Sequence, residues 1–145
     1  MNQTNQRIRE IFEQGYLMTL ATGDEGSVWA NEVIYVFDDA LNVYWISDPN
    51  VRHSQSILRH PQVAGVITVS RPGEDNFGIQ FSGTAEKIEG PRFDLAVKHY
   101  LKRKKSAPRE DQDILEGDSW YRLRPTFIEL IDEKHHGFEK QKIML

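Results

Sequence analysis

Residues 46–61, ISDPNVRHSQSILRHP, decide how the rest of the chain is interpreted. They predict the end of a β-strand, a short loop, and a helix that begins at Arg52 and His53. Because the first N–H groups of a helix have no intrahelical partners, a strand that enters a helix through such a loop forms a pocket lined with backbone donors. Ser47 adds a hydroxyl group and Arg52 a fixed positive charge, which together suit a phosphate. An ordinary strand–loop–helix connection with exposed polar residues is the alternative.

The chain before this stretch is predicted to contain one helix and three strands. Ile8, Ile11 and Phe12 fall on one face of the helix, and Gly15 is a natural stop. The turn GDEG at residues 23–26 joins two β-rich segments as a hairpin. The predicted ranges are a helix over 4–14 and strands over 16–22, 27–37 and 42–47.

From residue 52 onward the pattern predicts two helices and three or four strands. Pro91 opens the second of these helices, because proline suits a first turn. The apolar side chains that form one stripe along this helix are Phe93, Ala96, Val97, Tyr100 and Leu101. The other predicted ranges are a helix over 52–59, strands over 62–70, 77–89 and 119–132 (interrupted at Pro125), and a last strand or extended tail over 138–145. Mostly sequential strands with few helices favour a mostly β fold with α-helices (α+β). We expect an antiparallel barrel of six to seven strands with about three helices.

The composition is typical of a small soluble protein. The 145 residues suit one domain over 1–145, and the net charge of -4 does not favour nucleic acid or an anionic membrane as a partner. The longest apolar runs, such as residues 33–37, are far too short to span a bilayer. The first residues lack the basic and apolar regions of a signal peptide, and the absence of cysteine excludes disulfides and thiolate chemistry. We therefore expect a cytoplasmic protein without nucleic-acid or membrane partners.

Two predicted strands have unusual faces. Residues 27–37 do not alternate apolar and polar side chains as a half-exposed strand should. Both of their faces are apolar, so both are expected to be covered, by the chain's own helices, by a ligand or by a second subunit.

The strand over 77–85 has one apolar row and one neutral row, the latter formed by Gly78, Gln80, Ser82 and Thr84. A flat polar ligand can lie on such a row, although neutral rows also occur on edge strands.

The remaining candidate residues carry weaker signals. No histidine pair has the spacing of a zinc motif, so no metal site is predicted. His135 and His136 fall in a predicted turn, which is either exposed or supplies an axial ligand to a metal or a haem. The basic run at residues 102–105 fits a solvated helix end or a contact to an anionic substrate. Trp120 and Tyr121 begin a strand and suit the core or an interface. No catalytic acid or base is predicted.

Taken together, these segments resemble the pyridoxamine 5'-phosphate oxidase-like family of FMN-binding split barrels, and its short members most closely. The resemblance covers nearly the whole chain. It rests on the first helix, the helix after Pro91, and the segments MTLAT, VWANEVIYVFDD, YWISDPNVRHSQSILRHPQVAGVITV and GIQFSGTAEKI. The third of these segments is the most specific.

The resemblance implies an antiparallel split β-barrel that forms homodimers and binds FMN at the subunit interface. It implies that the strand end and helix start hold the ribityl phosphate and that the preceding strand lines the flavin. Gln80 falls on a flavin-facing strand, and Trp120 falls where a partner subunit contributes an aromatic residue. The cofactor-binding residues implied in this way are Asn31, Val33, Ile46, Ser47, Arg52, His53, Gln80 and Trp120.

The chain departs from the family pattern in two places. Members that bind FMN tightly often carry Arg near Asn31 and Lys at His53, and the Arg and His pair that the true oxidase uses on its substrate has no match near the C-terminal end. The resemblance therefore implies an FMN-dependent oxidoreductase that acts on a small molecule other than pyridoxamine 5'-phosphate. The alternative is a non-enzymatic carrier of flavin or haem, or a stress-associated protein, and a deazaflavin cofactor is a further option.

Overall fold

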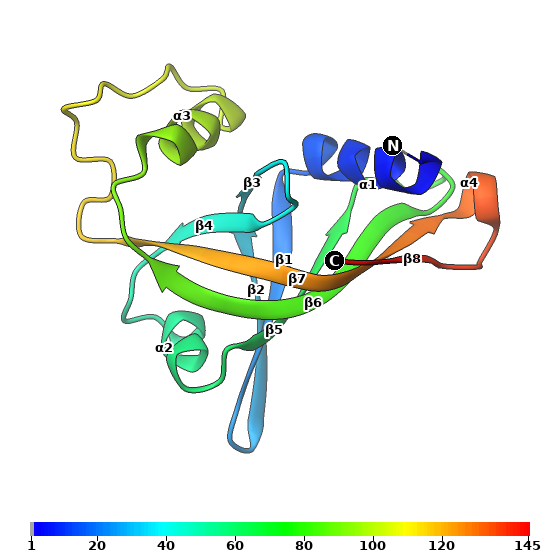
Figure 1. The fold of residues 1–145 in the computed structure, drawn as a ribbon, viewed down its shortest axis with the longest axis horizontal. Coiled ribbons are helices and arrows are strands. Elements are labelled where there is room, and N and C mark those ends of the chain that lie inside the picture. Colours follow the sequence, from blue (N-terminus) through cyan, green and yellow to red (C-terminus); the bar gives the residue numbers. More distant parts are fainter. Residues whose placement is uncertain (1) are drawn as a thin grey trace.

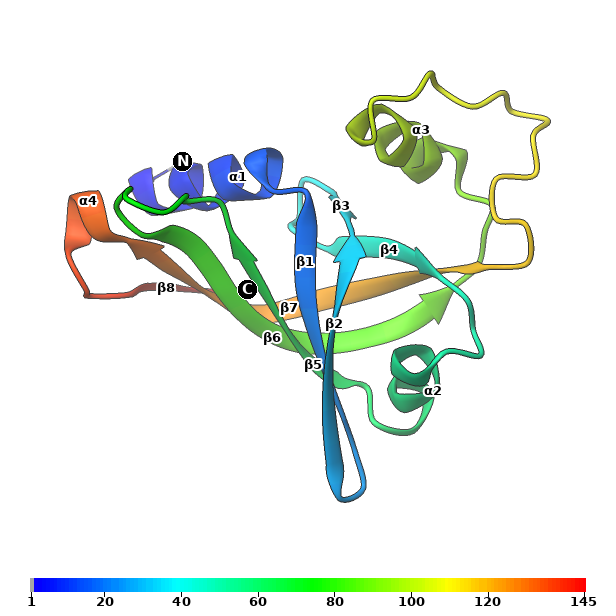
Figure 2. The ribbon, with the colours of Figure 1, turned by 180° about the vertical axis from the view of Figure 1, so that it is seen from behind.

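One antiparallel sheet, curled on itself, organises the fold (Figures 1 and 2). The computed structural model describes residues 2–145, which form four helices and eight strands. The strand order is β2-β1-β5-β6-β7-β4-β3, and β8 pairs with β7 outside this path. The predicted split β-barrel is confirmed, with β3, β8 and α4 as short additions. The elements are α1 (Gln3–Gln14), β1 (Leu17–Asp24), β2 (Ser27–Ile34), β3 (Val36–Phe37), β4 (Val43–Ser47), α2 (Arg52–Arg59), β5 (Gln62–Thr68), β6 (Phe77–Ile88), α3 (Phe93–Lys102), β7 (Ser119–Asp132), α4 (Glu133–His136) and β8 (Gln141–Met144).

The longest strands, β6 and β7, pair along their whole length and contain a bulge. The register shifts between Ser82 and Gly83, opposite Pro125, which confirms the predicted interruption there. Proline has no N–H to give to the ladder, so a bulge is the place where a paired strand accommodates it. Gly83 lies so close to β7 that a Cβ atom would meet the backbone oxygen of Arg124 and would stand 2.8 Å from the Cα of Pro125.

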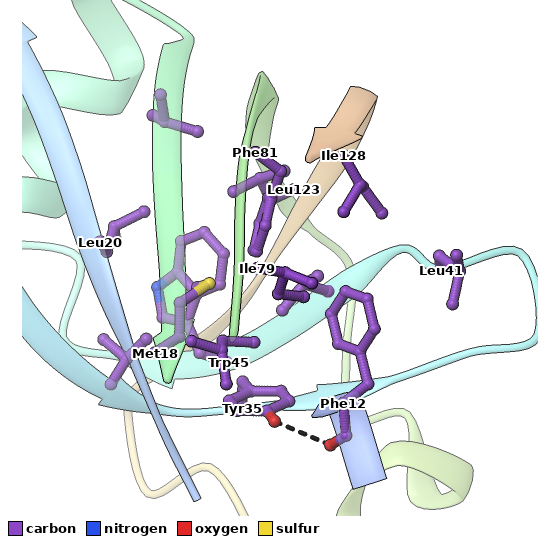
Figure 3. Packing of buried hydrophobic residues seen from close by; sticks show 14 of the residues in the cluster. Phe12, Met18, Leu20, Tyr35, Leu41, Trp45, Ile79, Phe81, Leu123 and Ile128 are labelled. Atoms are coloured by element: carbon purple, nitrogen blue, oxygen red, sulfur yellow. Dashed lines mark hydrogen bonds between the residues drawn. The ribbon is translucent and has the colours of Figure 1, made fainter. Parts of the chain in front are cut away.

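The main hydrophobic core fills the inside of the curled sheet, and α1 closes one end of it (Figure 1). Ile8, Ile11 and Phe12 form the buried face of α1, as their spacing predicts. The hydroxyl of Tyr35 donates a 2.7 Å hydrogen bond to the carbonyl oxygen of Phe12 (Figure 3). Trp45 is also fully buried in this cluster. The core thus anchors Tyr35, directly after β2, and Trp45 within β4, and the ends of both strands border the cavity described below.

The segment 27–37 is not one strand, contrary to the prediction. β2 ends at Ile34 and β3 begins at Val36, which pairs with Tyr44. Tyr35 and Val36 are neighbours in the chain, yet both are buried, in two different hydrophobic clusters, so the alternation no longer assigns faces across the break. Val28 is 84% exposed and Trp29 is 45% exposed, so the chain's own helices do not cover both faces of this segment.

The helix α3 buries a different face from the predicted stripe. Its buried residues are Leu95, Ala96 and His99, whereas Leu101 is 55% exposed. This face packs into a second, smaller core that contains Trp120. Trp120 lies near the start of β7, outside the main core. The buried face of α3 is therefore shifted by about one residue from the predicted apolar stripe. The helix begins at Phe93 rather than at Pro91.

The structure corrects two further predictions, for the histidine pair and for the basic run. His135 and His136 lie in the short helix α4, where a turn was predicted. Lys102 is not a solvated residue at the end of α3: its Nζ lies 3.2 Å from the centre of the Tyr35 ring and donates to the Tyr35 carbonyl oxygen at 2.5 Å. Within residues 2–145, no helix combines the length and the hydropathy that a membrane span requires.

Candidate functional site

A cavity of about 710 Å³ lies between the barrel and α3. Pockets that bind small molecules and cofactors occupy roughly 300–1,000 Å³, so this volume suits such a ligand. One wall comes from β1, β2, β4 and α2, and the other comes from α3 and the loop that follows it. Val33, Ile46, Ser47 and His53 all line the first wall. The structure thus brings together four of the eight residues that the family resemblance implies.

The end of β4 and the start of α2 form the polar part of the first wall. Ser47 is held in place by its pairing with Ser119 of β7. Its Oγ lies 2.9 Å from Nε2 of His53, and the tautomer of the imidazole decides which atom donates. Burial lowers the pKa of His53, so the imidazole is neutral at physiological pH and offers one donor and one acceptor. This pair can hold a polar group of a ligand but supplies no charge.

The first turn of α2 has the features of an anion-binding helix terminus. Val51 stands at the N-cap and makes no side-chain capping bond, so it leaves the first-turn N–H groups unsatisfied. Ser54, in the same turn, is fully buried and its hydroxyl has no partner. Asn31 faces the barrel interior opposite Leu20, and its buried Oδ1 also lacks a partner. Unpaired buried polar groups are costly, so they fit a site that a polar ligand completes.

Arg52 lies just outside the lining of the cavity. Its guanidinium carbon sits 4.2 Å from the centre of the Trp29 ring on the β1–β2 hairpin. The other end of α2 is also tied to the hairpin, because Arg59 donates to Asp24 and His60 Nε2 lies 3.2 Å from the same carboxylate. The hydrogen bond from Arg59, helped by a backbone N–H, lowers the pKa of Asp24 to about 2.

The second wall contains residues that the sequence did not single out. His99 is only 7% exposed, packs edge-on against Trp120 with ring centres 5.9 Å apart, and has an unpaired Nδ1. Burial, together with the charges of Arg103 and Lys102, lowers the pKa of His99 to about 4. The imidazole is therefore neutral at physiological pH. Tyr100, from the predicted apolar stripe, and Arg103, from the basic run, line the same wall.

The charges around the cavity are mixed. Arg103 and Lys105 line it together with Glu32, Glu116 and Asp118. Of the sequence signals, only the basic run at 102–105 points to this wall. No sequence motif marks the acidic residues, because segments that are distant in the sequence bring them to the cavity.

The other implied cofactor residues lie apart from the cavity. Gln80 is on the outer face of the sheet, where its Nε2 donates to Glu129 at 3.2 Å. Trp120 is fully buried, and its indole N–H donates to the carbonyl oxygen of Pro91 at 2.8 Å. Within one chain, neither side chain reaches a ligand in the cavity. Their roles remain predictions that concern a second subunit.

A separate polar cluster lies at the junction of β7 and α4. Asp132 is almost fully buried, accepts a 2.9 Å hydrogen bond from Nε of Arg7, and lies 2.9 Å from Nδ1 of His135. Burial raises the pKa of Asp132, but the bonds from Arg7 and His135 outweigh it and hold the pKa below its usual value. No group of three or more metal-ligating side chains occurs among residues 2–145.

The sequence profile of the pyridoxamine 5'-phosphate oxidase family matches residues 4–131. The chain belongs to this family. A UPF0306 protein of Yersinia pseudotuberculosis is 31% identical over 98 residues, which cover 66% of this chain and 67% of the relative. UPF0306 proteins of Yersinia pestis match equally well.

Solved structures of other proteins share this fold. A putative pyridoxamine 5'-phosphate oxidase from Listeria innocua superposes with a TM-score of 0.71 at 16% identity, covering 89% of this chain and 98% of its own. HutZ, a haem storage protein from Vibrio cholerae, superposes with a TM-score of 0.62 at 16% identity, covering 96% and 92%. At such low identity these likenesses show the fold alone. The same fold thus occurs in a putative oxidase and in a haem storage protein.

Proposed function

We propose that this member of the pyridoxamine 5'-phosphate oxidase family binds FMN in the 710 Å³ cavity and catalyses a flavin redox reaction on a small molecule. One observation carries the proposal. Val33, Ile46, Ser47 and His53, which the resemblance implies as flavin-binding residues, come from three separate elements and line one cavity.

The residues of the chain have distinct parts in this proposal. The uncapped first turn of α2 and the Ser47 hydroxyl receive the phosphate, and Arg52 stands beside them. Val33 and Ile46 give the wall an apolar surface that excludes water from the ring. His99 offers a neutral hydrogen-bonding group to a substrate on the opposite wall. The flavin, when bound, supplies the hydride and electron chemistry.

An absorbance spectrum tests the proposal. We expect protein mixed with FMN and then desalted to retain a band near ~450 nm, as an oxidised flavin does. Ser47→Ala removes a hydroxyl from the phosphate end and should weaken FMN binding about tenfold, since a hydrogen bond to a charged group contributes roughly 1.5–3 kcal/mol, part of which water replaces.

Ser106→Ala is the matched control, because Ser106 is exposed in the loop after α3. A protein that stays colourless after desalting would contradict FMN binding. Bound flavin that NADH and NADPH reduce no faster than free FMN would instead indicate a carrier.

The homodimer is part of the same proposal. Opposite residues across β2, β1, β5 and β6 form a row of small neutral side chains on the outer face of the sheet, namely Ala30, Ala21, Ala64 and Ser82. Val28 and Val66 lie exposed on the same face. Such a flat face suits a second copy of the chain. Gln80 belongs to this face, so it can approach a flavin only across a subunit interface.

Ala21→Arg should convert the dimer to a monomer. The substitution places a long charged side chain at the middle of the neutral row, where a facing copy would have to bury it unpaired. Light scattering coupled to size-exclusion chromatography measures the mass, and Ala40→Arg, in an exposed turn, is the matched control. Equal masses for both variants would contradict this interface.

A haem-binding carrier is the second candidate function. It is favoured by the contact between Asp132 and Nδ1 of His135, which leaves Nε2 of His135 free and is the arrangement typical of histidines that ligate metals. The exposed Phe138 nearby offers an apolar surface to a haem ring. This candidate predicts a Soret band upon haemin addition that His135→Ala abolishes, and an unchanged haemin spectrum would exclude it.

A further inference from the structure

The hairpin of β1 and β2 projects beyond the rest of the sheet, and α2 lies beside its base (Figures 1 and 2). Trp29 lies on the hairpin opposite Thr22, which is buried on the inner face. The Trp29 ring therefore turns towards α2, and Arg52 lies over it at 4.2 Å. Almost half of the Trp29 surface is exposed, so core packing does not account for a large aromatic residue at this position.

Arg52 carries the fixed charge at this end of the cavity. His53, its neighbour in the first turn, is neutral because burial lowers its pKa. The cations of the opposite wall, Arg103 and Lys105, belong to the loop after α3. A dianionic group at the start of α2 therefore depends on Arg52 for ionic compensation.

The contact with Trp29 leaves the guanidinium able to bind an anion. Arg52 makes no hydrogen bond or ion pair with the rest of the described chain, residues 2–145. A guanidinium that contacts an aromatic ring through its face keeps its N–H donors, which lie in its plane, free for oxygen acceptors. The ring restricts a flexible side chain and so reduces the entropy that an anion must remove on binding.

A second set of contacts holds α2 against the hairpin. Arg59 and His60 bind the carboxylate of Asp24 at the tip end of β1, so α2 is tied to the hairpin at its last turn as well as at its first. The distance between Trp29 and the start of α2 is therefore set by the fold and not by the contact between Trp29 and Arg52 alone.

We propose that Trp29 is a positioning residue that holds the Arg52 guanidinium beside the first turn of α2 and thereby makes the site select the phosphate of FMN over unphosphorylated riboflavin. The inference rests on the proposed FMN site and assigns its phosphate selectivity to a residue of the hairpin. Trp29 itself does not touch the flavin in this arrangement.

Binding of FMN and of riboflavin, each measured by fluorescence quenching of the flavin, tests the inference. Trp29→Ala should weaken FMN binding about fivefold and leave riboflavin binding unchanged, since cation–π contacts at exposed sites are modest. Trp29→Phe should retain most of the preference, because a phenyl ring also accepts the guanidinium. Arg52→Ala should weaken FMN binding more than tenfold, again without an effect on riboflavin.

A double-substitution cycle separates positioning from a structural effect. In the Arg52→Ala background, Trp29→Ala should have no further effect on FMN binding, because the group that it positions is gone. Leu58→Ala removes another exposed apolar side chain, on α2 itself, and serves as the matched control. Thermal unfolding of each variant checks that the hairpin remains folded.

The outcomes distinguish failure of the FMN site from failure of the positioning role of Trp29. If the unsubstituted protein binds neither flavin, the proposed function fails and the inference fails with it. If it prefers FMN and Trp29→Ala keeps that preference, or weakens both flavins equally, the positioning role is overturned while the FMN site stands. Additive effects of the two substitutions would overturn it as well.

Discussion

Gly83→Ala should lower the free energy of unfolding by about 3 kcal/mol, at the upper end of the cost of overpacking. A Cβ atom at this position would meet backbone atoms of Arg124 and Pro125, not the end of a flexible side chain. Relief requires β6 and β7 to separate at their bulge. Because β7 also pairs with β4, the shift would extend to Ser47 and the cavity.

Urea unfolding followed by circular dichroism measures this effect. Gly23→Ala is the matched control, because Gly23 also lies in a strand but a Cβ atom there would contact nothing within 4 Å. The control should be neutral or up to about 1 kcal/mol more stable, since alanine loses less backbone entropy than glycine on folding. Equal unfolding midpoints for the two variants would show that the bulge tolerates a side chain.

The stability of the protein should fall by about 3 kcal/mol between pH 6.5 and pH 4 through His99. Burial and two nearby cations lower the pKa of His99 from 6.5 to about 4 in the folded state. Between these values the unfolded chain binds a proton that the folded chain does not. The stabilisation is thus fully present above pH 6.5 and is lost as the pH falls to about 4.

Denaturant midpoints across this range give the measurement, and His99→Gln should remove most of the slope. His53 contributes in the same direction, because burial lowers its pKa as well, so some slope should remain. The carboxylates with lowered pKa values act mainly below this range; they are Asp24, Asp38, Glu86, Asp94 and Asp132. A slope that His99→Gln leaves intact would show that this imidazole is not the group that titrates.

Local signals in the sequence predict much of this fold. The helix Arg52–Arg59 has the predicted bounds, because an apolar face, a loop before it and Pro61 after it all act within a few residues. The neutral row with Gln80 likewise follows from a period of two along one strand. Ser47 and His53 meet because a tight connection joins their elements.

Features that depend on contacts between distant segments are not predictable in the same way. The buried face of α3 is set by Trp120, and the contact with this residue depends on where β7 places it. The break between Ile34 and Val36 exists because Val36 pairs with Tyr44, and no residue in the segment marks it. His99 and Glu116 reach the cavity for similar reasons, so the second wall has no sequence signature beyond the basic run.

The pairing of β4 with β7 also sets the order in which the protein can mature during synthesis. Ile46 lies opposite Trp120 and Ser47 opposite Ser119, so the strand β4, which ends at the cavity, lacks this partner until much later in synthesis. A nascent chain that stops before β7 contains α2, Arg52 and Trp29, yet it leaves one edge of β4 without this partner. We expect the proposed flavin binding to begin only after β7 has left the ribosome.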